Sequence, residues 1–266
     1  MEYRYDLGTS DVASFLQKMH LAHSKINWII NDHLFKLDGN TLILDSSLFK
    51  EKELKGISQP LDILYRDDYL LIVNKPKGII IYSDDENEVT LDQIVASYLA
   101  GLGLLSVPRH IYRLDRDTSG VMIYALDPLT LSYLSHLNET RELHKTYYAL
   151  CHGALNKKSG TIKLPLGRNR HDAHKMIVSK KGMEAITEYQ VLASNENRSL
   201  LALNLITGRT HQIRVHLAYL SHPVIGDKLY GIDDGVPLQL EVANVTFVHP
   251  ITGELVKVSL QNPLSI

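Results

Sequence analysis

The residues best suited to chemistry lie in one short charged stretch, residues 113–120. It places four charges and two hydroxyls directly before the apolar residues 121–126. A loop that leads into a buried strand is held rigid, so it is a common place for catalytic groups. Thr118 and Ser119 can bond backbone groups and fix the turn. The stretch is therefore a candidate catalytic loop, although an ordinary charged turn explains it equally well.

A second candidate segment, residues 207–217, combines basic residues with an amphipathic pattern. If Thr210 caps a helix that runs to about Leu220, His211 and Arg214 share one face of that helix. The helix N-terminus and its basic residues would form an anion site. An arginine directed at a buried carboxylate would keep that carboxylate ionised and fix its position. A routine surface helix explains the segment equally well.

The third segment is Lys145-Thr146-Tyr147, at the start of a predicted strand. A tyrosine ring can stack on a base, and its phenol can donate a hydrogen bond or exchange a proton. Taken alone, Tyr147 is more simply explained as a core aromatic residue.

The rest of the chain must position these segments, and its apolar periodicity predicts an α+β fold. Predicted strands outnumber helices and do not alternate with them regularly, so we expect a largely antiparallel mixed sheet with flanking helices. The predicted helices cover residues 12–19, 25–31, 90–102, 128–138 and 210–220. The predicted strands cover residues 34–37, 41–44, 63–65, 70–73, 120–126, 145–151, 185–193, 200–206, 241–248 and 255–260.

A boundary near Pro60 divides the chain, because the residue before a proline resists helix. Residues 1–57 are predicted to form a small α/β module with a hairpin turn at residues 38–40. The charged residues 50–55 are expected to be a surface linker, and residues 58–266 to form the main domain.

Charge is unevenly distributed, although the net charge is only −2. Residues 109–230 contain 17 Lys+Arg and 10 Asp+Glu, a net of +7, whereas the remainder contains 11 and 20, a net of −9. A polyanion would be attracted to the basic part. The fold could instead mix the two parts and cancel this asymmetry.

Composition argues against several other classes of protein. The one cysteine, Cys151, is expected to be buried; it excludes an internal disulfide and multi-thiolate zinc sites, and it fits a reducing cytoplasm. The N-terminus lacks a signal-peptide pattern, and no apolar run reaches the ~20 residues of a membrane span. His152, His171 and His174 could suggest a metal site, but their polar neighbours favour a solvated loop. We therefore expect a cytoplasmic protein without a bound metal.

Together, the three segments resemble the RluA-type family of RNA pseudouridine synthases. The family's H-R-L-D-x-x-T-S-G signature corresponds to residues 112–120, with Tyr112 in place of the usual histidine. Its K-x-Y element corresponds to residues 145–147, and G-R-T-H-Q-[IL]-R-V-H is matched in full by residues 208–216. The resemblance spans about residues 61–262. Its flanking matches are residues 63–68, 73–78, 165–168, 222–231 and 247–254.

The resemblance implies that the chain isomerises uridine to pseudouridine in structured RNA, either rRNA or tRNA, after flipping the base. Asp115 matches the family's catalytic aspartate, which either attacks the sugar C1′ or initiates glycal formation. Arg214 matches the arginine that pairs with this aspartate. Tyr147 matches the tyrosine that packs on the flipped base and can help to move the C5 proton. Arg113 matches the arginine that fills the gap left by the uridine, and no cofactor is needed.

Other residues of the matched segments are expected to contact RNA; these are Tyr112, Arg116, Lys145, Arg168, Arg209, His211 and Gln212. RNA is the expected partner, and a monomer is the expected state. Residues 1–57 resemble a degenerate S4-like RNA-binding module, although their 7 basic and 8 acidic residues suit an unrelated helical cap equally well. Residues 58–266 then form the pseudouridine synthase catalytic domain.

Two other functions remain open from sequence. The main alternative is a catalytically silent RNA-binding or ribosome-assembly factor on the same fold. A hydrolase built on Asp115 is a poorer alternative, because the chain offers only Asp117 as a nearby carboxylate and no metal-ligand set.

We predict that binding of structured RNA weakens steeply as salt rises, because basic side chains displace counterions from the phosphates. Filter binding at about 50 and 200 mM salt measures this dependence. An affinity that does not change between these conditions would contradict a basic RNA-binding surface.

Overall fold

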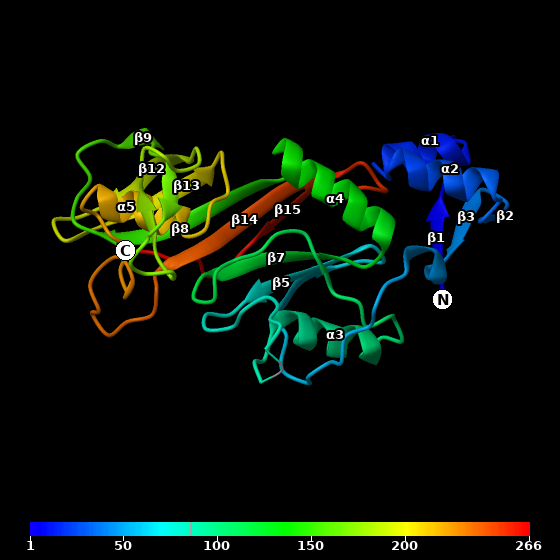
Figure 1. Ribbon diagram of the computed structural model, residues 1–266, viewed down its shortest axis with the longest axis horizontal. Coiled ribbons are helices and arrows are strands. Elements are labelled where there is room, and N and C mark those ends of the chain that lie inside the picture. The colour runs from blue at the N-terminus through cyan, green and yellow to red at the C-terminus, as the bar shows by residue number, and fades with distance from the viewer. Residues whose placement is uncertain (86) are drawn as a thin grey trace.

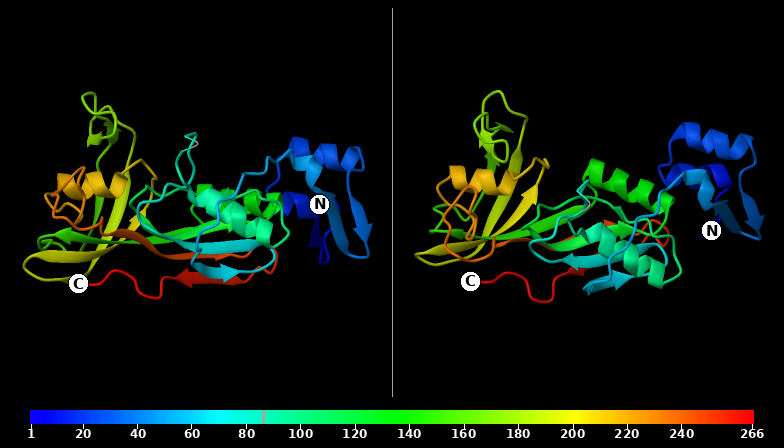
Figure 2. Two further views of the ribbon diagram at one scale, coloured as in Figure 1. Left: turned by 90° about the horizontal axis from the view of Figure 1, so that it is seen from below. Right: turned by 60° about the horizontal axis from the view of Figure 1, so that its bottom comes forward.

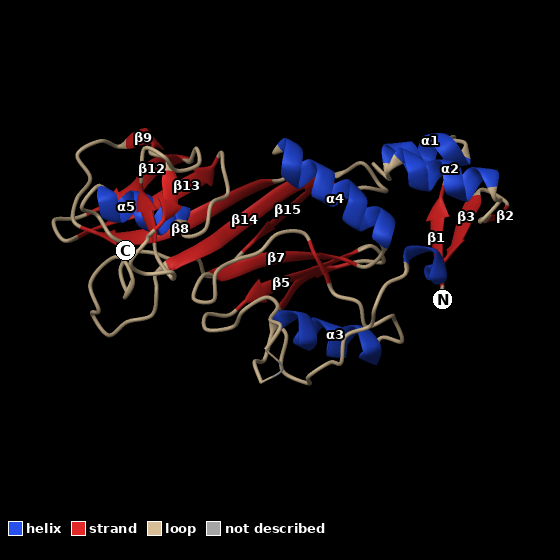
Figure 3. Ribbon diagram, viewed as in Figure 1, coloured by secondary structure: helices blue, strands red, loops and turns tan. Residues whose placement is uncertain are grey.

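The structure of the protein is a computed structural model that describes residues 1–85 and 87–266. Its elements gather in a small N-terminal part and a long main part (Figures 1 and 3). The small part contains β1 (Glu2–Asp6), α1 (Val12–Lys18), α2 (His23–Asn31), β2 (Lys36–Asp38), β3 (Thr41–Asp45) and the 3-10 helix η1 (Ser46–Phe49). The main part contains β4 (Ile63–Arg66), β5 (Leu70–Lys75), α3 (Leu91–Gly101), β6 (Arg109–His110), β7 (Ser119–Ala125), α4 (Pro128–Thr140), β8 (His144–His152), β9 (Ser159–Lys163), β10 (Leu166–Arg168), β11 (Met176–Val178), β12 (Ile186–Ser194), β13 (Arg198–Leu205), α5 (Gln212–Tyr219), β14 (Leu240–Val248) and β15 (Leu255–Ser259).

The main part is built on one ten-stranded sheet. Its strands follow the order β4-β5-β7-β14-β8-β13-β12-β9, with β15 added beside β14 and β6 beside β7. In the described residues every pair of these strands is antiparallel except β7 with β14. Helices α3, α4 and α5 lie on one face, from which the short β10–β11 hairpin projects (Figure 2). The structure thus confirms the predicted α+β fold with a largely antiparallel mixed sheet.

The core of the main part is centred on β5 and β7. Residues 70–73 and 121–125 are almost completely buried, which explains why both strands are continuous apolar runs rather than alternating ones. Cys151 on β8 is buried as predicted, and burial raises the pKa of its thiol to about 12. A thiol that keeps its proton and has no access to solvent is a packing residue rather than a nucleophile.

Three of the five α-helices in the described residues, α1, α3 and α4, begin at residues whose side chains cap them. Thr90 and Gln93 form a reciprocal capping box at the start of α3. Asp127 accepts hydrogen bonds from two backbone amides at the start of α4, and Pro128 occupies the first helical position. Asp11 caps α1 in the same way, through the amide of Ser14.

The N-terminal part has its own three-stranded sheet, in the order β1-β3-β2, and its own buried core. The predicted hairpin is present, with Gly39 in the left-handed conformation at φ +59°. Strand β1 was not predicted. It alternates buried and exposed residues, and its Tyr3 and Tyr5 point inward.

Buried polar contacts join the N-terminal part to the main sheet. Arg109 pairs with Glu51, and its Nη2 donates to the Tyr3 hydroxyl at 2.8 Å. The Tyr5 hydroxyl donates to Asp127 Oδ1 at 2.7 Å. Residues 50–55 were expected to be a surface linker, and for Glu51 this is wrong, because its carboxylate is needed to neutralise the buried Arg109 guanidinium.

We predict that Glu51→Ala lowers the free energy of unfolding by about 3–5 kcal/mol, because it leaves the Arg109 guanidinium buried without its partner. Urea unfolding followed by the fluorescence of Trp28, the single tryptophan, measures the loss. The control is Glu2→Ala, which removes an exposed pair with Arg4 and should cost less than about 1 kcal/mol. Equal losses in the two variants would contradict this role of Glu51.

Candidate active site

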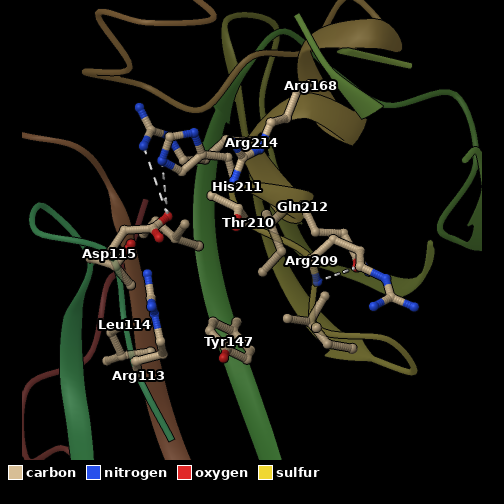
Figure 4. Close-up of a pocket in the computed structure, with 15 residues that line it drawn as sticks. Arg113, Leu114, Asp115, Tyr147, Arg168, Arg209, Thr210, His211, Gln212 and Arg214 are labelled. Carbon is tan, nitrogen blue, oxygen red and sulfur yellow. Dashed lines mark hydrogen bonds and ion pairs between the residues drawn. The ribbon is translucent and has the colours of Figure 1, made fainter. Parts of the chain in front are cut away.

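Three segments that are far apart in the sequence meet in one cleft of the main part (Figure 4). They are the loop before β7, strand β8 and the start of α5. The cleft has a volume of about 450 Å³, within the ~300–1,000 Å³ that is typical of small-molecule sites. Most of the residues predicted from sequence line it, namely Arg113, Asp115, Tyr147, Arg168, Arg209, His211, Gln212 and Arg214.

Strand β14 sets the distance between the loop and Tyr147. Val242 on β14 pairs with Gly120 of β7 on one side and with Tyr147 of β8 on the other. Neighbouring strands lie ~4.8 Å apart, so β7 and β8 lie about 10 Å apart across this single strand. The loop that carries Asp115 therefore faces Tyr147 across a gap fixed by backbone hydrogen bonds.

Gly120 allows the catalytic loop to enter the sheet. Its φ is +112°, and a Cβ at this position would lie 2.3 Å from the carbonyl oxygen of Val242. A side chain would thus clash with the β14 backbone, and its backbone conformation would also be strained. This is the physical reason for the glycine that ends the stretch 113–120.

The loop is held from the core side by Lys75, whose side chain is completely buried. Its Nζ donates to the carbonyl oxygens of Thr118 at 2.7 Å, Arg116 at 2.8 Å and Pro76 at 3.1 Å. Burial lowers the pKa of Lys75 to about 8, although nearby carboxylates oppose this shift. Three carbonyl acceptors fix the ammonium, and the ammonium in turn fixes the backbone on both sides of Asp117.

The Asp115 carboxylate faces two nitrogen groups across the cleft (Figure 4). Arg214 Nη1 lies 3.9 Å and His211 Nε2 lies 3.8 Å from Asp115 Oδ2. Both are ion-pair distances rather than hydrogen-bond distances. Both nitrogens face the same carboxylate oxygen, Oδ2, and neither of them is paired with Oδ1.

Arg214 is fixed by a second carboxylate, Asp227, to which the sequence reasoning gave no role. Nε and Nη2 of Arg214 donate to Asp227 at 2.8 and 2.7 Å, and both residues are buried. Asp227 also accepts the backbone amides of Leu229 at 3.0 Å and Tyr230 at 3.1 Å. This bidentate pair sets the plane of the guanidinium and leaves Nη1 to face Asp115. Asp227 lies within the matched residues 222–231, so the motif was the signal that could have identified it.

Tyr147 lines the cleft from β8 and is largely buried. Burial, and secondarily the negative charge of Asp115, raises the pKa of Tyr147 well above its ordinary value. The phenol therefore keeps its proton at neutral pH. Tyr147 both packs in the core and presents a surface to the cleft, so its two interpretations from sequence do not exclude each other.

The start of α5 corrects one expectation. Thr210 does not cap the helix, which begins at Gln212 with His211 before it in the left-handed conformation at φ 56°. The buried side chain of Gln212 instead holds the residues that precede the helix, because its Oε1 accepts the backbone N–H of Arg209 at 3.0 Å and the hydroxyl of Thr207 at 2.8 Å. Gln212 thereby folds the preceding loop back against the cleft (Figure 4).

Arg113 is exposed at the mouth of the cleft. Its Nη1 donates to the hydroxyl of Tyr82 at 3.0 Å. The Tyr82 ring is itself stacked on His110, with ring centroids 5.5 Å apart and an angle of 7° between the planes. The long arginine side chain is therefore restrained before any ligand binds.

Three residues predicted to contact RNA lie outside this cleft. The Tyr112 hydroxyl donates to the Val121 carbonyl at 2.6 Å, and Lys145 Nζ lies 4.5 Å from the centre of the Tyr112 ring. Burial lowers the pKa of Lys145 to about 8. Arg116 is exposed and pairs with Glu88 beside an adjoining hollow. Tyr112, which stands where the family usually has histidine, therefore packs behind the loop.

No helix within residues 1–85 and 87–266 is long and apolar enough to cross a membrane. In the same ranges no three His, Cys, Asp or Glu side chains are grouped as metal ligands would be.

The comparisons with known proteins agree on one family. Residues 69–219 match the family model described as RNA pseudouridylate synthase. The chain is 43% identical over 203 residues to the uncharacterized RNA pseudouridine synthase YhcT of Bacillus subtilis, a match that covers 74% of this chain and 67% of that protein. It is 34% identical over 223 residues to the ribosomal large subunit pseudouridine synthase D of Xanthomonas campestris, covering 77% and 66% respectively. The chain thus matches about two thirds of the length of these relatives.

Solved structures give the same result. The chain superposes on human RNA pseudouridylate synthase domain containing 1 with a TM-score of 0.65 and 29% identity, covering 78% of this chain and 86% of that one. Human RNA pseudouridylate synthase domain containing 4 gives a TM-score of 0.63 and 26% identity, covering 76% and 88%.

We predict that Lys75→Met lowers the free energy of unfolding by about 1–3 kcal/mol at pH 7, because carbonyls of the loop lose a buried donor. Unfolding in urea measures the loss, and exposed Lys257→Met is the matched control. The pH dependence of this loss tests the lowered pKa of Lys75. Since Lys75 titrates near 8 and an unfolded lysine near ~10.4, the unfolded chain binds more protons between these values, so wild type should gain stability over the variant as pH rises. A difference that falls with pH over this window would contradict the lowered pKa of Lys75.

Proposed function

This chain belongs to the RNA pseudouridylate synthase family, and we propose that it isomerises uridine to pseudouridine in structured RNA with Asp115 as the catalytic carboxylate. One observation carries the assignment of Asp115. Asp115 lies on a loop that Lys75 and Gly120 hold in place, and its carboxylate faces a buried arginine across the cleft. Rigid placement of a reactive group opposite fixed charge is what catalysis by preorganisation requires.

The isomerisation breaks the bond between C1′ and N1 of uridine and forms a bond between C1′ and C5. The proton on C5 is lost and N1 gains one, so the atoms balance without a redox partner or a group donor. In our proposal Asp115 either forms a bond with C1′ or initiates loss of a sugar proton to give a glycal. Both routes use an ionised carboxylate, which the Arg214 guanidinium supports at 3.9 Å.

We assign Tyr147 to the uracil ring. Its protonated phenol lies on the strand that faces the loop, and its ring can pack on the base after C1′–N1 cleavage. A phenol that keeps its proton is suited to pack on the ring and to hydrogen-bond to it. It can take part in moving the C5 proton only as a relay that donates its own proton as it accepts the other.

We propose that Arg113 takes the place of the target base in the RNA. The reacting atoms are hidden in a stacked helix, so the nucleotide must leave the stack to reach the cleft. Arg113 is exposed at the mouth, and its hydrogen bond to Tyr82 restrains the side chain, which reduces the entropy that is lost on insertion.

The substrate is proposed to be rRNA or tRNA. The name of one relative refers to the large ribosomal subunit, which makes large-subunit rRNA the first substrate to test. Arg168 and Arg209 around the cleft, and Arg116 beside it, are the proposed phosphate-facing residues. We also propose a cytoplasmic monomer in which residues 1–57 are an S4-like module and residues 58–266 the catalytic domain.

We predict that Asp115→Asn lowers turnover by more than about 10³-fold while the affinity for RNA stays within about threefold. The change keeps the volume of the side chain and removes its charge, and phosphate contacts elsewhere should preserve binding. Release of the C5 hydrogen as tritium from labelled RNA measures turnover, and thermal unfolding checks the fold. The control is Asp68→Asn, an exposed aspartate outside the cleft.

Retained turnover in Asp115→Asn would remove the central assignment. RNA binding by wild type without any tritium release would favour the silent RNA-binding or ribosome-assembly factor instead.

A further inference from the structure

His211 contacts the catalytic carboxylate on one side and a tyrosine hydroxyl on the other. Its Nε2 lies 3.8 Å from Asp115 Oδ2, and its Nδ1 lies 2.7 Å from the hydroxyl oxygen of Tyr230. Its side chain is 17% exposed. The left-handed backbone at φ 56° directs the imidazole toward the cleft rather than along α5. Both ring nitrogens therefore face a defined partner.

The direction of the hydrogen bond to Tyr230 follows from its other partner. The backbone N–H of Met176 donates to the same hydroxyl oxygen at 2.8 Å. A backbone amide can only donate, so the hydroxyl accepts there and keeps its own proton to donate. Nδ1 of His211 is the acceptor within reach among the described residues. A neutral imidazole whose Nδ1 accepts carries its proton on Nε2, the nitrogen that faces Asp115.

The charge of His211 depends on four surrounding groups. Asp115 and Asp227 favour the imidazolium, Arg214 disfavours it, and Tyr230 stays neutral because burial raises its pKa. Burial of His211 is the largest influence, and it lowers the pKa of the imidazole below its ordinary value of 6.5. At pH 7.5 the ring is accordingly neutral.

We propose that His211 is a positioning residue for the reaction, a neutral imidazole that directs Nε2–H at Oδ2 of Asp115, and that Tyr230 fixes this tautomer. The proposal rests on the proposed role of Asp115. A neutral donor orients the carboxylate without cancelling its charge. Of the two groups that face Asp115, His211 is then neutral and Arg214 is the cation. The separation of 3.8 Å closes to a hydrogen bond when RNA fills the cleft, as often happens at sites seen without ligand. His211 is then not a phosphate contact, because both of its nitrogens are already committed.

The tautomer can be read directly by NMR. Protein labelled with ¹⁵N-histidine and examined at pH 7.5 without RNA should show His211 with a protonated Nε2 and an unprotonated Nδ1, and the signals are assigned by their absence in His211→Gln. Tyr230→Phe removes the donor and should shift the nitrogen signals toward the other tautomer or the imidazolium. Tyr219→Phe changes an exposed tyrosine at the end of α5 and should leave them unchanged.

Kinetics test the positioning role. The amide nitrogen of Gln can reach the position of Nε2, whereas that of Asn reaches only as far as Nδ1. We expect kcat to fall on the order of 10- to 100-fold in His211→Asn and less in His211→Gln, with KM for RNA nearly unchanged. Asn adopts the left-handed backbone more readily than Gln, so an advantage of the Gln variant must come from the position of its amide.

Three results would overturn the inference. They are a protonated Nδ1 in the wild-type protein at pH 7.5, an unchanged tautomer in Tyr230→Phe, and a loss in His211→Asn that is confined to KM. The NMR result needs neither RNA nor turnover. It therefore separates failure of this inference from failure of the Asp115 assignment, which Asp115→Asn tests alone.

Discussion

The arrangement of the site depends on the pairing of one central strand. Val242 of β14 joins Gly120, where the catalytic loop enters the sheet, to Tyr147, which lies opposite. The pair β7–β14 is the one parallel contact in the described part of the main sheet, and it brings the backbones so close that only glycine fits at position 120. Backbone hydrogen bonds rather than flexible side chains thus hold the two sides of the cleft apart.

Charged side chains around Asp115 also determine the arrangement of the site. The guanidinium of Arg214 is shared between Asp227, which binds it through two short hydrogen bonds, and Asp115, which it approaches at 3.9 Å. Asp227 fixes the position of the guanidinium. Asp115 is therefore stabilised by the positive charge of Arg214 without forming a bidentate pair with it. On the core side, Lys75 adds a second positive charge behind the loop, and its hydrogen-bond partners among the described residues are backbone carbonyls. The proposed nucleophile therefore remains accessible while the charges around it stay fixed.

Most of the fold could be predicted from the sequence because its long strands are apolar and α1, α3 and α4 begin at clear caps. The strands β1, β6, β9, β10 and β11 and the start of α5 are exceptions, and β6, β10 and β11 are only two or three residues long. Strand β1 is short and rich in charge, and only the two tyrosines that alternate along it mark it as a strand. The start of α5 could not be predicted because Gln212, a residue inside the helix, satisfies the preceding loop in place of Thr210. The cleft residues Asp115, Tyr147 and Arg214 were found through their motifs. Lys75 and Asp227 also lie in matched segments, but a motif does not show what a side chain contacts, so their roles were not predicted.

The central claim is that this chain makes pseudouridine in RNA through Asp115. The most direct test is a map of pseudouridine across total RNA from cells with and without the gene, with copies of wild type or Asp115→Asn returned to the cells that lack it. The account predicts that one or a few positions lose pseudouridine, and that wild type restores them whereas Asp115→Asn does not. A map that does not change when the gene is removed, or one that Asp115→Asn restores, would contradict it.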